Sequence, residues 1–307
     1  MSKIPNSILW WCKRTLRFAG SRLLNAGGAI PDSLLTSAET EIVARNSVFR
    51  DKHKGRRCFV IATGPSLKTQ DITPLGDEIT FVMSGFWKHA ATEVWQPTYY
   101  CISDPLYFDG SEPMRNFFNS LTARCPNSTF LVPLSARHVI KEQHLLPEER
   151  TYPVAFGSDL EQRQIRELNL AKSIPPPMTV SQFCLMAAIY MGCSPIYLLG
   201  FDHDWLSHRS THRHFYDGLG GLEAHPQVRP ELKDHSYKEV MECALVIWRG
   251  YEALLNLVRR KGIQILDATN GGFLDVFELA NYEELLNEID HSDQAEKEKI
   301  SASPKLA

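Results

Sequence analysis

The sequence lacks three features that would place it in a specialised class of protein. Among its 307 residues, no run approaches the roughly 18 consecutive apolar residues that a membrane-spanning helix requires. Its seven cysteines are scattered without any C-x-x-C spacing, which argues against both a zinc ribbon and a disulfide framework. Its formal net charge is only −3, with both signs spread along the chain, so no overall field favours nucleic acid. We therefore expect a globular, cytoplasmic protein that binds no nucleic acid.

The first 30 residues differ in character from the rest, because they contain basic side chains and no acid before Asp32. The basic residues are interleaved with apolar ones, including Trp10 and Trp11, and they interrupt the apolar centre that a secretory signal would need. An amphipathic basic helix of this kind is typical of a segment that lies on an anionic membrane surface. We expect residues 3–24 to hold the protein on the inner face of the membrane. The alternative is a terminal helix that docks on the body of the protein.

The remainder predicts a single α/β catalytic domain over residues 51–290, after an N-terminal appendage and linker at 1–50 and before a polar, disordered tail at 291–307. Helices and strands alternate along this domain, which is typical of a Rossmann-like, mainly parallel sheet with helices on both faces. Strands are expected at 58–62, 79–83, 98–102, 128–133, 195–199 and 263–266, and helices at 33–46, 136–144, 179–192 and 237–261. Residues 145–178 show no clear pattern.

The central unit is an apolar helix, starting near Thr179, that leads into the apolar strand 195–199. The strand runs into Gly200, and the acidic side chains Asp202 and Asp204 follow at once. In open α/β sheets, ligands bind in the crevice at the carboxyl ends of the strands. The sequence therefore predicts part of a ligand site here; the alternative is that these acids only cap turns.

The first strand ends in a turn that could hold a phosphate. Gly64 would let a ligand approach the backbone, Pro65 sets φ for a helical turn, and the hydroxyl groups of Thr63 and Ser66 are capping candidates. A strand, a glycine turn and a helix start together form a phosphate or nucleotide cradle. A plain β-turn is the alternative.

Two further strands end in small or acidic polar residues: 79–83 runs into Ser84 and Gly85, and 98–102 runs into Asp104. Because the carboxyl ends of parallel strands meet at one edge of a sheet, we expect all these residues to share one crevice.

Residues 201–234 are rich in His, Gly, Arg and Pro without periodicity, which indicates an inserted lid or binding loop. We expect a cationic lid, with Arg209 and Arg213, to close on an anionic donor while Tyr216 donates a hydrogen bond to the leaving group. The alternatives are a metal site at His208 and His212, which are four residues apart, and an ordinary polar loop.

Three motifs carry a resemblance to a known family over residues 55–280. They are Ile61-Ala62-Thr63-Gly64-Pro65-Ser66-Leu67, the 179–192 helix that runs into Ile196-Tyr197-Leu198-Leu199-Gly200-Phe201-Asp202, and His235-Ser236 before the long helix. In this order they resemble bacterial sialyltransferases of the Campylobacter type. They are also similar to the DUF115 group, which includes flagellin-modifying Maf proteins and archaeal MptE-type 6-hydroxymethylpterin diphosphokinases.

The sialyltransferase resemblance implies a GT-A-like Rossmann fold, a CMP-activated nonulosonic acid as donor, a glycan or lipid-linked acceptor, and no metal or other cofactor. It places a general base at His235, where a neutral imidazole could accept a hydroxyl proton; the alternative is a capping histidine. Together with the turns above, it implies catalytic residues His235, Asp202 and Tyr216 and a nucleotide-sugar site formed by Thr63, Gly64, Pro65, Ser66, Ser84, Gly85, Asp104, Thr179, Gly200 and Asp204.

The chain departs from that pattern, because Thr63, Ser84 and Asp104 stand where the sialyltransferases have asparagines, and Asp204 stands in place of a tyrosine. Acids near a phosphate repel it unless a cation intervenes. In the diphosphokinases an acidic site holds Mg²⁺ against ATP phosphates, and Asp104, Asp202 and Asp204 could do the same. We expect a glycosyltransferase of surface-polysaccharide or glycoconjugate synthesis; the alternatives are an Mg²⁺/ATP-dependent diphosphokinase and a non-catalytic nucleotide-binding scaffold.

Overall fold

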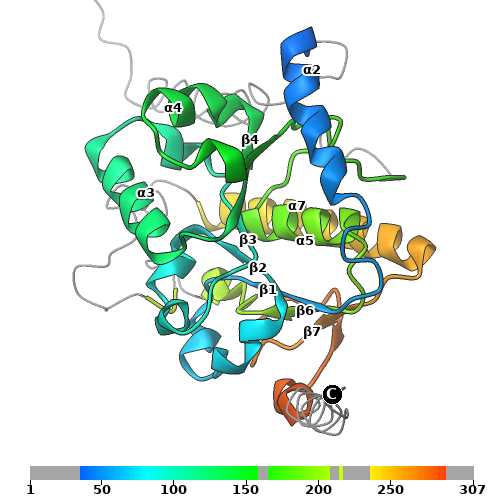
Figure 1. Cartoon of the computed structure of the whole chain (residues 1–307). Coiled ribbons are helices and arrows are strands. Elements are labelled where there is room, and N and C mark those ends of the chain that lie inside the picture. Colours follow the sequence, from blue (N-terminus) through cyan, green and yellow to red (C-terminus); the bar gives the residue numbers. More distant parts are fainter. Residues whose placement is uncertain (1–34, 158–164, 208–213, 217–235, 288–307) are drawn as a thin grey trace, which may run out of the picture.

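The computed structural model describes residues 35–157, 165–207, 214–216 and 236–287. Its centre is an eight-stranded sheet in the order β5-β4-β3-β2-β1-β6-β7-β8, and every pair of neighbouring strands is parallel (Figure 1). The strands are β1 Cys58–Ile61, β2 Ile79–Met83, β3 Tyr99–Cys101, β4 Thr129–Pro133, β5 Thr151–Val154, β6 Ile196–Leu199, β7 Ile265–Asp267 and β8 Glu278–Leu279. The predicted parallel sheet is confirmed.

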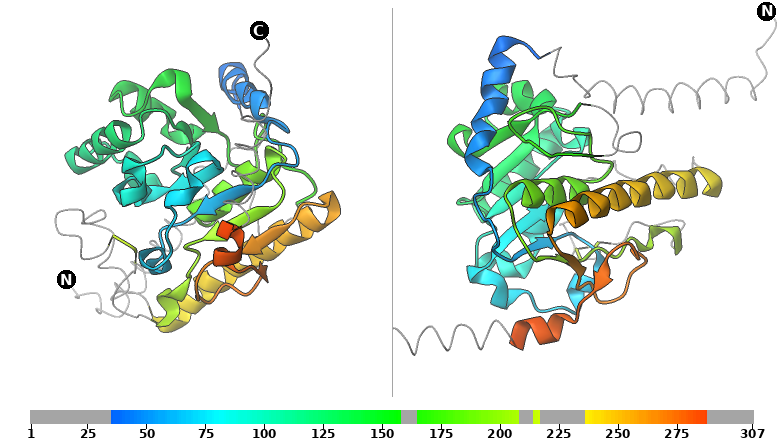
Figure 2. Two further views of the ribbon diagram at one scale, coloured as in Figure 1. Left: turned by 60° about the horizontal axis from the view of Figure 1, so that its bottom comes forward. Right: turned by 90° about the vertical axis from the view of Figure 1, so that its right-hand side faces the viewer.

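Helices cover both faces of the sheet, as the alternation of elements predicts. They are α2 Ser37–Ala44, α3 Glu112–Arg124, α4 Arg137–Glu142, α5 Val180–Tyr190 and α7 Tyr237–Lys261. Figure 2 shows α5 and α7 running side by side on one face. The side chains of β1 divide accordingly: Cys58 and Val60 belong to the apolar core beneath α5 and α7, and Phe59 and Ile61 to the core beneath α3 and α4. Because both faces are covered, the central strands are continuous apolar runs.

Helix α5 is more deeply buried than its predicted single apolar face implies. All of its residues from Ser181 to Tyr190 are buried, because the helix lies between the sheet and α7. Its buried polar residue Gln182 is satisfied on both sides: the side-chain amide donates to the Ile247 carbonyl at 2.8 Å, and its oxygen accepts from the Met178 N–H at 2.8 Å. The hydroxyl group of Thr179 caps the helix by accepting from the Gln182 N–H.

The long helix α7 has the bounds that the sequence predicts, since both of its ends are set locally. Ser236 and Glu239 form a reciprocal capping box at the start, and Gly262 ends the helix in the left-handed region with φ of 68°. None of the helices in the described ranges is long and apolar enough to cross a membrane.

Three elements differ from expectation. The edge strand β5 lies in the stretch without a clear pattern; Pro153 is tolerated in it because an edge strand pairs on one side only. Helix α3 and the two-residue strand β8 were also not predicted. After β1 the chain forms only a short 3-10 helix, η3, Pro65–Lys68, although Pro65 does begin it as expected. Residues 1–34 of the predicted appendage at 1–50, and the whole predicted tail at 291–307, lie outside the described residues.

A crevice at the switch point of the sheet

The candidate site is a crevice of about 540 Å³ at the carboxyl ends of the central strands. The strand order reverses between β1 and β6, with β2 to β5 on one side and β7 and β8 on the other. This is the topological switch point at which open α/β sheets bind ligands. The crevice is lined by nine of the residues that the sequence nominates: Thr63, Gly64, Ser84, Asp104, Thr179, Gly200, Asp202, Asp204 and Tyr216.

The turns that follow β1 and β6 are locked together at the floor of the crevice. The Asp202 carboxylate accepts hydrogen bonds from the Ser66 N–H at 3.0 Å and from the Ser66 hydroxyl at 2.8 Å. The Gly64 N–H donates to the Gly200 carbonyl at 3.0 Å. A Cβ atom on Gly64 would lie 1.8 Å from Asp202 Oδ2, so only glycine fits there. Ser66 and Pro65 therefore support the crevice without lining it.

Burial raises the pKa of Asp202, and the two hydrogen bonds from Ser66 act in the opposite direction. Both carboxylate oxygens are engaged in this contact. Asp202 thus caps a turn, which was one of the two roles that the sequence allowed. It fixes the geometry of the turn after β1.

The walls contributed by β2 and β3 carry the other predicted polar groups. Ser84 adopts φ of 49°, which is uncommon for a residue other than glycine, and its carbonyl accepts a 2.7 Å hydrogen bond from the buried Tyr100 hydroxyl. Asp104 caps the 3-10 helix Pro105–Phe108, because its Oδ1 accepts from the Leu106 N–H at 3.0 Å. Each side chain therefore faces the crevice from a turn that its own neighbourhood holds in place.

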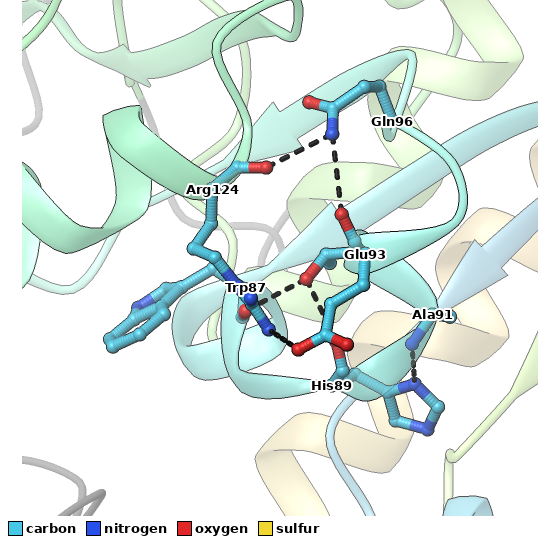
Figure 3. Close-up of polar contacts among 7 residues, drawn as sticks. Trp87, His89, Ala91, Glu93, Gln96 and Arg124 are labelled. Atoms are coloured by element: carbon cyan, nitrogen blue, oxygen red, sulfur yellow. Dashed lines mark hydrogen bonds and ion pairs between the residues drawn. The ribbon is translucent and has the colours of Figure 1, made fainter.

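Polar contacts tie the segment that follows β2 to the last residue of α3 (Figure 3). The Arg124 guanidinium pairs with Glu93 at 2.9 Å, and the Gln96 amide donates to the Arg124 carbonyl at 3.0 Å. His89 Nδ1 accepts from the Ala91 N–H at 3.1 Å, and burial lowers the pKa of this imidazole. These bonds fix the segment that follows Ser84.

Residues 214–216, a described part of the predicted lid at 201–234, pack onto the crevice. His214 Nδ1 lies 3.1 Å from the Thr63 hydroxyl, and the Phe215 N–H donates to the Thr63 carbonyl at 3.0 Å. The Tyr216 ring stacks on His214 with centroids 4.8 Å apart and covers Gly85, where an added Cβ would lie 2.7 Å from Tyr216 Cε1. Gly85 is thus required by Tyr216 and does not itself line the crevice.

His203 is a crevice residue to which sequence reasoning gave no separate role. Its Nε2 lies 2.8 Å from the Tyr251 hydroxyl, which lies 2.7 Å from the Ser181 hydroxyl. Burial lowers the pKa of His203 to about 3, so the ring is neutral at physiological pH. Its φ of 45° is a second sign of a special position. In the sequence, the only indication of this role is that His203 stands between Asp202 and Asp204, just after the strand that ends at Leu199.

Among the described residues, no three His, Cys, Asp or Glu side chains are grouped so that they could hold a metal ion. The acids expected to bind Mg²⁺ also accept hydrogen bonds, Asp202 from Ser66 and Asp104 from the Leu106 N–H.

Several predicted residues lie outside the described part of the chain. They are His208, Arg209, His212, Arg213 and the proposed base His235. The residue after that base, Ser236, caps α7, and the hydroxyl of Tyr237 donates to the Leu206 carbonyl at 3.0 Å. The start of α7 therefore contacts the 3-10 helix Asp204–Ser207, two residues of which, Asp204 and Trp205, line the crevice.

The fold and the crevice define an α/β protein with a Rossmann-like parallel sheet and a ligand-sized site at its switch point. Neither the protein-family models nor the curated proteins include a match to the chain. Among solved structures, it is similar to the sialyltransferase CstII from Campylobacter jejuni in complex with a substrate analogue, CMP-3FNeuAc. The TM-score is 0.40 at 15% identity, over 73% of this chain and 86% of that one. The fold class accordingly rests on the sheet itself.

Proposed function

We propose that this protein is a glycosyltransferase of surface-polysaccharide or glycoconjugate synthesis, which transfers a sugar from a nucleotide-activated donor to a glycan or lipid-linked acceptor. The observation that carries the proposal is the crevice at the switch point, where the glycine turn after β1 meets the strand tip of β6. A volume of about 540 Å³ is within the usual range for small-molecule sites, roughly 300–1,000 Å³. The donor that we favour is a CMP-activated nonulosonic acid, on the basis of the motif resemblance.

The crevice is lined by three acids, Asp104, Asp202 and Asp204, which would repel an anionic donor if they all faced it. The hydrogen bonds around the crevice reduce this difficulty. Both oxygens of the Asp202 carboxylate accept hydrogen bonds from Ser66, so this acid is part of the floor and its oxygens would not contact a bound phosphate directly. Thr63, Ser84 and Thr179, which all carry hydroxyl groups, line the same space. Such groups can bind a phosphate or a sugar by hydrogen bonds without a metal.

In this proposal His235 accepts the proton of the acceptor hydroxyl, and Tyr216 donates a hydrogen bond to the departing nucleotide. The contact of Tyr237 with Leu206 supports a base at this place, since it brings the start of α7 against the rim of the crevice. Neutral His203 would serve as a hydrogen-bonding group that does not change its charge near pH 7.

The first experiment is thermal stabilisation of the full chain by CMP, UDP, GDP and ATP, each with excess Mg²⁺ and again with EDTA. A nucleotide at about 100 times its Kd should add about 2.7 kcal/mol to the free energy of unfolding. We expect stabilisation by CMP that persists in EDTA. Stabilisation by ATP only with Mg²⁺ would instead indicate the diphosphokinase, and binding without turnover over a broad panel of donors would indicate a scaffold.

The role of the base is tested in the same assay by His235→Ala, with the exposed His138→Ala as the matched control. We expect His235→Ala to abolish transfer and to retain the CMP-induced stabilisation, because a base acts on the acceptor. Full turnover in this variant would exclude His235 from the mechanism.

A further inference from the structure

A second cavity, of about 590 Å³, lies away from the crevice. It is bounded by α2, the end of α3, α4 and the segment that leads into β5, which surround β4 in Figure 1. Its lining includes residues at or before the starts of β4 and β5, whereas the crevice residues follow their strands. The two cavities share no lining residue, so a ligand of one would not occupy the other.

The inner wall of this second cavity is apolar. It is formed by side chains that are buried in the core beneath α3 and α4, among them Cys125, Phe130, Ile140, Leu145 and Leu146. These five side chains are between 0 and 7% exposed, so each presents only a small apolar surface to the cavity. Covering that surface with an apolar group would be stabilising in proportion to the area removed from water.

The rim of the second cavity is basic. It carries Arg45, Arg137, Lys141, His144 and Arg150, against the single acid Glu148. Arg137 and Lys141 are four residues apart on α4, where like charges destabilise a helix. Within the described ranges, neither of these two side chains nor Arg45 forms an ion pair. Three of these residues have partners outside the lining: Arg150 pairs with Glu149 at 3.5 Å, Arg137 interacts electrostatically with Glu39, and Arg45 lies 5.6 Å from the centre of the Tyr152 ring. Even so, the lining itself carries more basic than acidic side chains.

We propose that the second cavity binds a phosphorylated amphiphile, with the phosphate at the Arg137–Lys141 rim and an apolar chain along the inner wall. Guanidinium groups match phosphate oxygens in a bidentate geometry, and an ammonium adds a point charge. A bare anion would leave the apolar wall uncovered, and a neutral amphiphile would place no negative charge beside Arg137 and Lys141. A ligand with both a phosphate and an apolar chain would use both parts of the cavity. The proposal is independent of the donor crevice and of the proposed transferase activity.

The test uses three probes on the full chain: n-octyl phosphate, inorganic phosphate and n-octyl glucoside, each below its micelle concentration. Binding is measured by titration calorimetry and by thermal stabilisation. We expect n-octyl phosphate to bind at least tenfold more tightly than either of the other two. Equal binding of inorganic phosphate, or of n-octyl glucoside, would overturn the proposal, because one half of the ligand would then suffice.

The variants separate the site from general surface charge. The double variant Arg137→Ala/Lys141→Ala is expected to weaken n-octyl phosphate binding at least tenfold. The control Arg166→Ala/Lys172→Ala removes the same two charges from exposed positions that line neither cavity, and it should retain full affinity. Thr122→Phe, at a half-buried lining position, should reduce the binding of the octyl chain by filling the space. Unchanged affinity in the double variant would overturn the proposal.

Two sources of such a ligand are distinguished by a fourth probe, dihexanoyl phosphatidic acid. If this short-chain lipid binds at least as tightly as n-octyl phosphate, and the double variant loses both, the ligand is a membrane glycerolipid. If only n-octyl phosphate binds in a manner that depends on Arg137 and Lys141, the ligand is a single-chain phosphate. Both results support the phosphorylated amphiphile.

Discussion

Gly64 has no room for a side chain. Gly64→Ala would place a methyl group 1.8 Å from Asp202 Oδ2 and 2.5 Å from the Gly200 carbonyl, and both belong to the floor of the crevice. We expect this variant to lose about 1–3 kcal/mol of unfolding free energy through overpacking, together with its nucleotide response. Urea denaturation and the nucleotide-shift assay measure the two effects.

The matched control is Gly55→Ala, where an added Cβ has no neighbour within 4 Å but φ is 72°. Its expected loss is about 1–2 kcal/mol, from backbone conformation alone. Because Gly55 is remote from the crevice lining, its nucleotide response should be unchanged. A Gly64→Ala protein with wild-type stability and nucleotide response would contradict the locked floor.

His203 should make the protein sensitive to mild acid. Its folded pKa of about 3 lies below the ordinary 6.5, so the unfolded chain binds more protons between these values. The free energy of unfolding therefore rises with pH through this window and is fully present above pH 6.5. Between pH 7.5 and 5.0 the loss from this residue is about 2 kcal/mol.

The measurement compares the wild type with His203→Asn, since asparagine tolerates a positive φ. We expect the variant to lose less stability than the wild type between pH 7.5 and 5.0. Burial of Asp267, which raises its pKa to about 6, acts in the opposite sense, since it adds stability as pH falls from 6 towards 3.8. That contribution is common to both proteins and cancels in the comparison. Parallel pH profiles would show that His203 is not held neutral.

The sequence could predict which turns meet at the crevice, because strand tips in a parallel sheet share one edge. It could not predict that Asp202 would bond to Ser66, which lies 136 residues away. That pairing depends on how closely two turns approach, and the approach is set by the absence of a side chain on Gly64. The same limit applies to His203, whose low pKa comes from the surrounding burial.

At the scale of elements, the buried Tyr251 of α7 makes one of the polar contacts that join this helix to α5. The Tyr251 hydroxyl lies 2.7 Å from the Ser181 hydroxyl and 2.8 Å from His203 Nε2. Tyr251→Phe is expected to remove about 1–3 kcal/mol of unfolding free energy, because His203 Nε2 loses this hydrogen-bond partner and Ser181 keeps only Thr179. Urea denaturation of Tyr251→Phe, Ser181→Ala and the double variant gives the coupling, and the double loss should be smaller than the sum. Strict additivity would mean that the hydroxyl pair contributes nothing.

Elements whose ends are encoded locally could be predicted most accurately. Helix α7 begins at a capping box and ends at a glycine, and both signals are visible in the sequence. Strand β5 contains Pro153 and forms only because β4 supplies a partner, which no local pattern reveals. Helix α3 could have been predicted, because Met114, Phe118 and Leu121 are spaced as the buried face of a helix.

At the scale of the whole molecule, the basic N-terminal segment predicts attachment to anionic membranes. We expect the full chain to sediment with vesicles that contain acidic lipid at about 50 mM salt and to be released at about 300 mM, because salt screens this attraction. Replacing its basic residues with glutamine should abolish the binding: Lys3, Lys13, Arg14, Arg17 and Arg22. As the control, the same glutamine replacement at five exposed basic residues of the domain should leave vesicle binding nearly unchanged: Arg166, Lys172, Lys238, Arg259 and Lys261. Binding that survives the first set would refute the prediction.

The order of the strands also has a consequence for how the chain is made. The central strand β1 pairs on one side with β2, through Cys58 and Ile79, but on the other side with β6, through Cys58 and Ile196. During synthesis, that second edge of β1 stays without its partner until residue 196 has left the ribosome. An open edge in the middle of an apolar sheet is a template for aggregation. A nascent chain arrested before β6 would therefore depend on a chaperone, although the finished protein buries this strand completely.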